Sequence, residues 1–150
     1  MRCEYYLSAI TLLNALVVAG VAVRQYQLSK ERFKFDLFDK RYGVYKNTQI
    51  FLDKICSSMK VEREDIWEFR AGTQDSMFFF NNDIPDYLDI VEEKAVRLWK
   101  IRETLKDLAD GEERTQLAKE MSEIVAMWFP EQLPLLRNKF EPYLAFKRWK

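Results

Sequence analysis

An uncharged, mostly apolar run near the N-terminus is the clearest pattern in the chain. It covers residues 5–23 (YYLSAITLLNALVVAGVAV), and these nineteen residues are long enough to cross the hydrocarbon core of a bilayer as a helix. A tyrosine pair at one end and Arg24 at the other are typical of the two membrane interfaces. The pattern predicts a transmembrane helix over residues 5–23, followed by an extramembrane domain over residues 24–150.

A cleaved signal peptide is the alternative interpretation, because Gly20, Val21 and Ala22 offer small residues before a cut. However, Arg2 is offset by Glu4, and the stretch after the run is basic, which hinders export. Six basic residues follow the run within eighteen positions, whereas only one precedes it. The positive-inside rule therefore places the N-terminus outside and the C-terminal domain in the cytoplasm, as in a single-pass membrane protein.

Small side chains form one face of the predicted membrane helix. Ala15, Ala19 and Ala22 allow close packing of helices, and Asn14 can form a hydrogen bond across a helix pair. We expect these four residues to mediate self-association in the membrane. The alternative is that alanine is simply common in such helices.

Apolar residues then recur at a heptad-like spacing, at Leu28, Phe35, Phe38, Tyr42, Tyr45, Leu52, Cys56 and Met59. No proline precedes Pro85, so we expect the membrane helix to continue to about Ser58. The stripe is either a core face covered by later helices of the same chain, which is favoured, or a parallel coiled coil between copies. The residues expected to make these packing or assembly contacts are Phe35, Phe38, Tyr42, Tyr45 and Leu52.

The rest of the chain has helical periodicity and no alternating strand pattern. We expect helices over 62–71, closed by Gly72, over 84–109, over 112–129, broken by Pro130, and over 131–140, ending before Pro142. Residues 74–82 are ambiguous between a short helix and a packed loop. The predicted fold class is all-α, in which an N-terminal transmembrane helix continues into a long helix that packs with a cytosolic bundle of about three to four shorter helices.

Charge is balanced overall but segregated along the chain. The 24 Lys and Arg residues equal the 24 Asp and Glu residues, which argues against a generally basic nucleic-acid binder. Residues 24–60 carry nine basic and four acidic side chains, residues 61–131 nine and eighteen, and residues 132–150 five and one. Both basic segments suit an anionic leaflet, so we expect the bundle to fold back with its acidic part away from the membrane.

Composition also limits the chemistry. The chain has no histidine, which excludes a Ser-His-Asp or Cys-His catalytic set and a His-liganded zinc site. Two distant cysteines exclude a disulfide scaffold and a four-thiolate zinc site. Without a phosphate loop, CxxC pair or nucleophile elbow, the sequence predicts no catalytic residue, cofactor or metal, and a protein that is not an enzyme.

Two charged groups have both a chemical and a structural interpretation. Asp83, Asp86, Asp89 and Glu92 would bind a metal only if a second cluster, such as residues 62–65, faced them, and acidic residues stabilise a helix start anyway. A second possibility is a phosphate or nucleotide pocket lined by Lys40, Arg41, Lys46, Arg70 and Arg97.

The C-terminal stretch over residues 143–150 (YLAFKRWK) mixes aromatic and basic side chains. Its Lys147, Arg148 and Lys150, together with Lys40 and Arg41, are the candidates for contacts with an anionic ligand or lipid. The membrane interface is the favoured partner of the tail, and a packed terminus or a nucleic-acid contact are the alternatives.

Residues 37–45 (LFDKRYGVY) and 140–144 (FEPYL) resemble stretches of a recurrent class of small bacterial inner-membrane proteins, mostly hypothetical, with an N-terminal membrane helix and a helical cytosolic domain. The resemblance implies a bacterial or phage-associated source and location in the inner membrane, but no agreed activity. In this stretch Phe38, Tyr42 and Tyr45 are expected to face the core, with Lys40 and Arg41 on the other side of the helix.

The architecture is also similar, more loosely, to the membrane accessory proteins of type VI CRISPR systems, which assemble into pores. The Arg-x4-His signature of helical nuclease-like domains is absent, because the chain has no histidine. The analogy therefore implies an assembly role rather than a nuclease role.

The sequence as a whole favours a non-enzymatic membrane protein that self-assembles through residues 15–59 and acts as an effector or accessory in a bacterial system, in its most concrete form antiviral defence. Its expected partners are membrane lipids, further copies of the chain and a protein from the same operon. The alternatives are a monomeric membrane tether for a cytosolic protein and a nucleotide sensor at the membrane.

Overall fold

The computed structural model describes the backbone of residues 2–145 and the side chains of residues 13–145. Every regular element within this range is helical, which confirms the predicted all-α class. The chain divides into two units, Met1–Leu37 and Phe38–Lys150. Helix α1, Arg2–Ser58, contributes to both units, so the prediction of one continuous helix to about Ser58 is correct.

The first unit consists of the N-terminal part of α1. Large apolar side chains between Leu13 and Val23 are exposed, and exposed aromatic residues follow at Tyr26, Phe33 and Phe35. Among the residues that the structure describes, no helix is long and apolar enough to cross a membrane. The predicted span begins at residue 5, and the side chains of residues 5–12 lie outside the described ones.

The buried face of α1 in the second unit differs from the predicted stripe. It contains Val44, Thr48, Phe51, Leu52 and Ile55, all at most 5% exposed. Val44, Phe51 and Ile55 lie one position before the predicted Tyr45, Leu52 and Cys56, a rotation of about 100° around the helix. Thr48 obscures the apolar periodicity because it is a polar residue at a core position. It can be buried because its hydroxyl donates a hydrogen bond to the Val44 carbonyl (2.8 Å).

Only part of the predicted packing set therefore lies in the core. Leu52 is fully buried, and Tyr45 and Cys56 rest against the core. Burial raises the pKa of the Cys56 thiol, as expected for a packed rather than a reactive cysteine. Phe35 and Tyr42 are exposed and Phe38 is half-buried, so the core-face interpretation does not hold for Phe35 and Tyr42. A role of these residues in assembly stays a prediction.

A tight connection leads from α1 to α2, Arg63–Thr73, through Met59, which has a positive φ of 56°. Helix α2 does not end at Gly72 as predicted, and this glycine has no positive φ. Its role is close packing instead, because a Cβ there would lie 2.5 Å from Nδ2 of Asn47. The same Nδ2 donates a hydrogen bond to the Gly72 carbonyl (3.1 Å) and joins α1 to α2.

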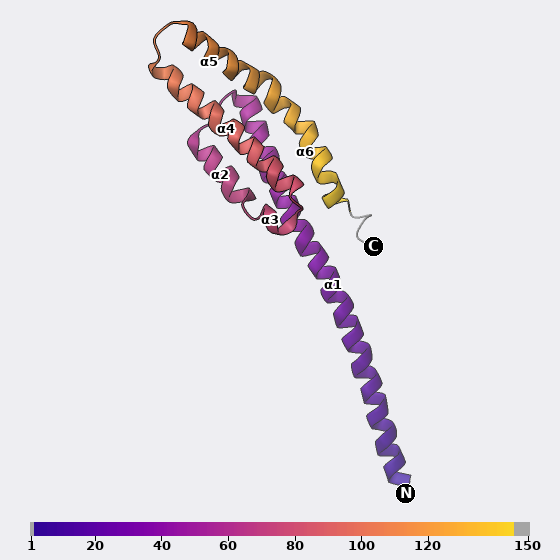
Figure 1. Cartoon of the computed structure of the whole chain (residues 1–150). Coiled ribbons are helices and arrows are strands. Elements are labelled where there is room, and N and C mark those ends of the chain that lie inside the picture. The colour runs from indigo at the N-terminus through magenta and orange to yellow at the C-terminus, as the bar shows by residue number, and fades with distance from the viewer. Residues whose placement is uncertain (1, 146–150) are drawn as a thin grey trace. The chain divides into compact units, whose positions relative to one another are not determined.

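The ambiguous stretch 74–82 contains a short helix, α3, Ser76–Phe79, which leads into α4, Asp83–Asp107. Helix α4 packs against α2 (Figure 1). Its buried side chains follow the predicted stripe at Leu88, Val91, Ala95 and Leu98. Residue Leu105, also predicted, packs against the core from a partly buried position.

Helices α5, Glu112–Glu123, and α6, Phe129–Leu144, are joined by a π-helical segment, η1, Ile124–Trp128. The predicted break at Pro130 is therefore wrong, and so is the predicted end before Pro142. In the π-helical turn the Phe129 N–H bonds to the Ile124 carbonyl, five residues back, and this wider turn accommodates the Pro130 ring. Helices α4 and α5 lie side by side (Figure 1), and the fully buried Phe129 and Phe140 anchor α6 in the core.

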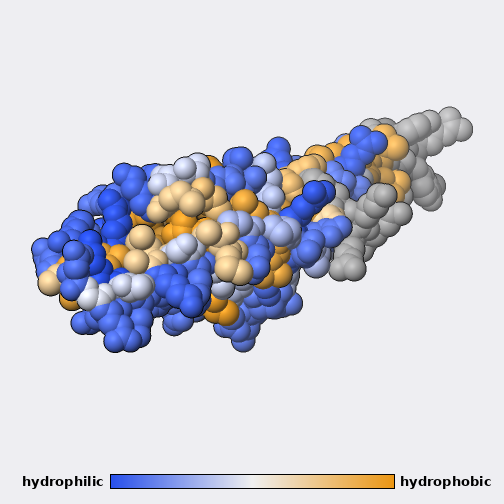
Figure 2. Space-filling view, turned by 90° about the horizontal axis from the view of Figure 1, so that it is seen from above, coloured by the Kyte–Doolittle hydropathy of each residue, from blue (hydrophilic) through white to orange (hydrophobic). Residues whose placement is uncertain are grey.

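Apolar surface is not confined to the core of the second unit. Figure 2 shows hydrophobic patches between hydrophilic side chains on the face seen from above. Large apolar side chains that are at least half exposed occur on most of its helices, at Ile50, Trp67, Met77, Phe78, Ile90 and Met127. These side chains are available for contacts outside the chain.

Candidate functional site

Residues from two distant sequence segments, 38–45 and 140–144, contribute to one site in the second unit. Arg41 and Tyr45, on α1, contact Tyr143 and Phe140, on α6. The fold thus brings together residues that are about a hundred positions apart in the chain. We call this site the Arg41 junction.

Arg41 is the centre of the junction. Its Nε donates a hydrogen bond to the Phe79 carbonyl (2.8 Å) at the end of α3. Its guanidinium carbon lies 5.7 Å from the centre of the Phe80 ring and 5.3 Å from that of Tyr143, both within the range of a cation–π interaction. A single side chain therefore links α1, the end of α3 and the end of α6.

Aromatic contacts and one hydrogen bond complete the junction. The Phe80 ring meets the rings of Phe140 and Tyr143 edge-on, with centroids 5.2 and 5.1 Å apart, and Tyr45 packs on Phe140 at 5.6 Å. The Tyr143 hydroxyl donates a hydrogen bond to Asp83 Oδ1 (2.6 Å), at the start of α4. The C-terminal end of α6 is thus held to three other elements.

The ionisable groups of the junction, Arg41 and Tyr143, have pKa values that suit a structural role. Burial lowers the pKa of Arg41, although arginine remains charged at any physiological pH. Burial, and then the hydrogen bond to Asp83, raise the pKa of Tyr143. Both groups therefore keep their protons near neutral pH, and the arrangement is suited to holding helices rather than to transferring protons.

The other predicted cationic residues do not line one pocket with Arg41. Arg70 Nε donates to Glu92 (3.0 Å), and its guanidinium lies over Trp67. Arg97 makes a bidentate pair with Glu120, at 2.7 and 2.6 Å. Arg70 and Arg97 are thus each paired with a separate carboxylate, and a phosphate or nucleotide pocket stays a prediction.

The remaining predicted basic residues divide into two groups. Lys40 and Lys46 are exposed on α1. Lys147, Arg148 and Lys150 lie outside the described residues, so their predicted contacts with an anionic ligand or lipid stay predictions.

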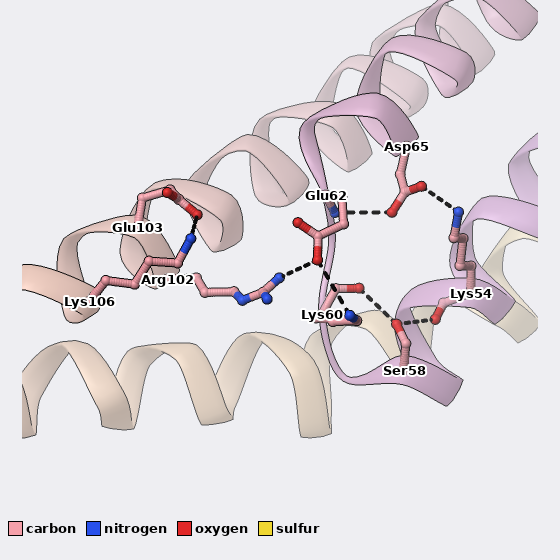
Figure 3. Close-up of polar contacts among 8 residues, drawn as sticks. All are labelled: Lys54, Ser58, Lys60, Glu62, Asp65, Arg102, Glu103 and Lys106. Carbon is pink, nitrogen blue, oxygen red and sulfur yellow. Dashed lines mark hydrogen bonds and ion pairs between the residues drawn. The ribbon is translucent and has the colours of Figure 1, made fainter.

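A second polar cluster forms where α1 turns into α2 (Figure 3). Asp65 is 8% exposed at its side chain, forms an ion pair with Lys54 and accepts the Glu62 backbone N–H (3.0 Å) as part of a capping box. Arg102, on α4, donates to Glu62 Oε1 (2.8 Å). Burial alone would raise the pKa of Asp65, but the hydrogen bonds from Lys54 and Glu62 hold it below its usual range. The cluster ties the α1–α2 turn to α4.

The two predicted clusters of carboxylates, over residues 83–92 and residues 62–65, make separate contacts and do not form one site. Asp83 is bonded to Tyr143, Glu92 to Arg70, and Glu62 to Arg102. Across the described part of the chain, no group of three or more acidic or cysteine side chains is placed to hold a metal ion.

The residues predicted to mediate self-association in the membrane lie in the first unit. Asn14, Ala15, Ala19 and Ala22 are all exposed along α1. This placement leaves them available for contacts with lipid or with other copies.

Sequence reasoning missed the partners of Arg41. The aromatic run over residues 78–80 and the segment over residues 140–144 were each visible in the sequence. The pairing between them depends on the return of α6 to the start of α4, which periodicity does not reveal.

Comparison of the chain with protein-family models, with curated proteins and with solved structures gives no match.

Proposed function

We propose that this chain is a non-enzymatic, single-pass protein of a bacterial inner membrane, which assembles into homo-oligomers and presents its helical bundle to the cytoplasm. The observation that carries the proposal is the exposure of apolar side chains along the uncharged part of α1. Leu13, Leu16 and Val18 are 64–68% exposed, and Val17, Val21 and Val23 are 50–60% exposed.

Such an apolar surface is favourable only where lipid or protein shields it from water. Fully burying one side chain of this kind is worth about 1.5–3 kcal/mol, so leaving several of them in water is unfavourable. Lipid is the cover that fits best, because the same uncharged run extends back to residue 5 in the sequence and reaches bilayer length. The basic residues that follow it support a cytoplasmic position for the bundle.

Self-assembly is supported by the small-residue face of the same helix. Asn14, Ala15, Ala19 and Ala22 are exposed, and this set suits close helix packing with a hydrogen bond across the pair. Assembly of the membrane helices is consistent with an effector or accessory role. Bacterial antiviral defence is the most concrete setting for such a role.

A monomeric tether for a cytosolic partner is the second candidate. It is favoured by Met77 and Phe78 on α3, which are 66% and 73% exposed and could form the centre of a protein contact. A nucleotide sensor is less well supported, because Arg70 and Arg97 are engaged in ion pairs.

Extraction of membranes with alkaline carbonate tests the anchor. We expect the wild-type chain to stay in the membrane pellet and a Leu16→Arg, Val17→Arg variant to be released, because each arginine at the centre of a span costs about 2.5–3.5 kcal/mol. An Ile50→Arg, Ile90→Arg variant is the matched control, since both isoleucines are exposed in the second unit. Release of the wild-type chain would refute the anchor.

A further inference from the structure

A groove with an apolar floor and an acidic rim lies between α4 and the run from α5 to α6. Its volume is about 420 Å³. The floor is formed by Ile124, Met127 and Trp128, and the rim by Glu120, Glu123 and Glu131. The π-helical segment supplies the whole floor.

The groove has the chemistry of a site for a cationic, aromatic segment. Met127 is 61% exposed and Trp128 is half-buried, so apolar surface is open at the floor. Lys94 also lines the groove, and its ammonium lies 5.8 Å from the centre of the Trp128 ring, which shows that the indole accepts a cation here. Glu120 is engaged by Arg97, whereas Glu123 and Glu131 are exposed at the rim.

We propose that this groove binds the C-terminal segment of a second copy of the chain, residues 146–150 (FKRWK). This segment combines three basic and two aromatic side chains, which complement the acidic rim and the Met127–Trp128 floor. It follows directly after α6 and lies outside the described residues.

The segment cannot occupy the groove of its own chain. Glu131 is the groove residue nearest to it in sequence, and the helix from Glu131 to Leu144 spans about 20 Å at about 1.5 Å per residue. Fully extended, the residues from Leu144 to Lys150 reach at most about 22 Å, so only Lys150 reaches the level of Glu131. The other residues of the segment fall short of the Met127–Trp128 floor, so the whole segment cannot bind there. The occupant therefore comes from another copy.

The contact joins two different surfaces, so two copies can exchange tails reciprocally as a two-fold dimer, or each copy can give its tail to the next and build a ring. This inference rests on the proposed self-assembly and adds to it a contact between bundles. The membrane helices would then hold the copies close together, and the groove would fix how neighbouring bundles are oriented.

Charge reversal in the full chain, purified in a non-ionic detergent, tests the contact by light scattering. We expect Lys147→Glu with Arg148→Glu, and separately Glu123→Lys with Glu131→Lys, to raise the dissociation midpoint of the oligomer about tenfold. Combining all four substitutions should restore assembly. The matched control is Asp53→Lys with Asp107→Lys, two exposed carboxylates outside the groove, which should leave the midpoint unchanged.

A disulfide test keeps the inference independent of the folding of these variants. In a Cys3→Ser, Cys56→Ser background, Met127→Cys and Arg148→Cys chains are prepared separately and mixed under oxidising conditions. We expect a cross-linked pair only in the mixture, and no cross-link when Arg148→Cys is mixed with an Ile90→Cys chain.

The outcomes separate this inference from the proposed function. An oligomeric wild-type chain with no rescue by the fourfold variant, or with no specific cross-link, overturns the groove contact and leaves membrane assembly standing. Loss of assembly in the tail variant alone would show that the tail binds another partner, such as lipid, and would also overturn it. A monomeric wild-type chain would refute both.

Discussion

Arg41 is the residue that best shows how local sequence and tertiary structure diverge. Its position after a lysine on a long helix predicts a solvated charge or an anionic contact. In the structure it is half-buried, donates to the Phe79 carbonyl and lies over the rings of Phe80 and Tyr143. The sequence contained each partner, but the helical pattern alone could not bring residues 41, 80 and 143 together.

The geometry of Arg41 predicts a specific requirement for a guanidinium. We expect Arg41→Lys to lower the free energy of unfolding by about 1–2 kcal/mol, because lysine keeps the charge but loses the Nε–H bond and the planar contact with two rings. Lys40→Ala, at the exposed neighbouring position, should change it by less than about 0.5 kcal/mol. Urea unfolding of the full chain in detergent, followed by tryptophan fluorescence, measures both values. Equal effects of the two substitutions would contradict the role of the junction.

At the scale of elements, the helices were largely predictable and their faces less so. The stripe of α4 was found because Leu88, Val91, Ala95 and Leu98 are all apolar. The buried face of α1 was missed because Thr48 interrupts it, while exposed Tyr42 imitates a core position. The continuity of the helix through Pro130 was missed because it depends on a π-helical turn that has no pattern of its own.

The corrected face of α1 leads to a prediction with an internal control. Ile55 is 1% exposed and Ile50 is 54% exposed on the same helix. We expect Ile55→Ala to cost about 2–5 kcal/mol of unfolding free energy, since it leaves a cavity, and Ile50→Ala to cost less than about 1 kcal/mol. The same urea titration compares the two variants. A larger loss for Ile50→Ala would show that the opposite face of the helix is packed.

The α1–α2 turn predicts a dependence of stability on pH. The pKa of Asp65 is lower in the folded chain than in the unfolded one, so its contribution is complete above the unfolded value of about 4 and is lost as the pH falls through the folded value. Wild-type stability should therefore decrease below about pH 4 more steeply than that of Asp65→Asn. Unfolding midpoints measured between pH 7 and pH 3 check this. Parallel curves for the two proteins would contradict the assigned role of the Lys54–Asp65 pair.

At the scale of the whole molecule, the sequence predicted which part of the chain is an apolar segment and which is a helical domain. It predicted the individual contacts less well. An uncharged first segment and a charged helical domain were both evident, and the structure shows exposed apolar side chains in the first and a packed core in the second. Assembly depends on contacts between copies, which the periodicity and charge pattern along one chain do not specify. The proposal that the chain is a membrane-anchored oligomer joins these two properties in one account.

The mass of the full chain, purified in a non-ionic detergent and measured by light scattering with correction for bound detergent, tests that account most directly. We expect one closed oligomer of about four or more copies of the 18.0 kDa chain, and a smaller species for an Ala15→Leu, Ala19→Leu variant, whose larger side chains prevent close approach of the membrane helices. A wild-type chain that is monomeric at every concentration would contradict self-assembly and would favour the tether.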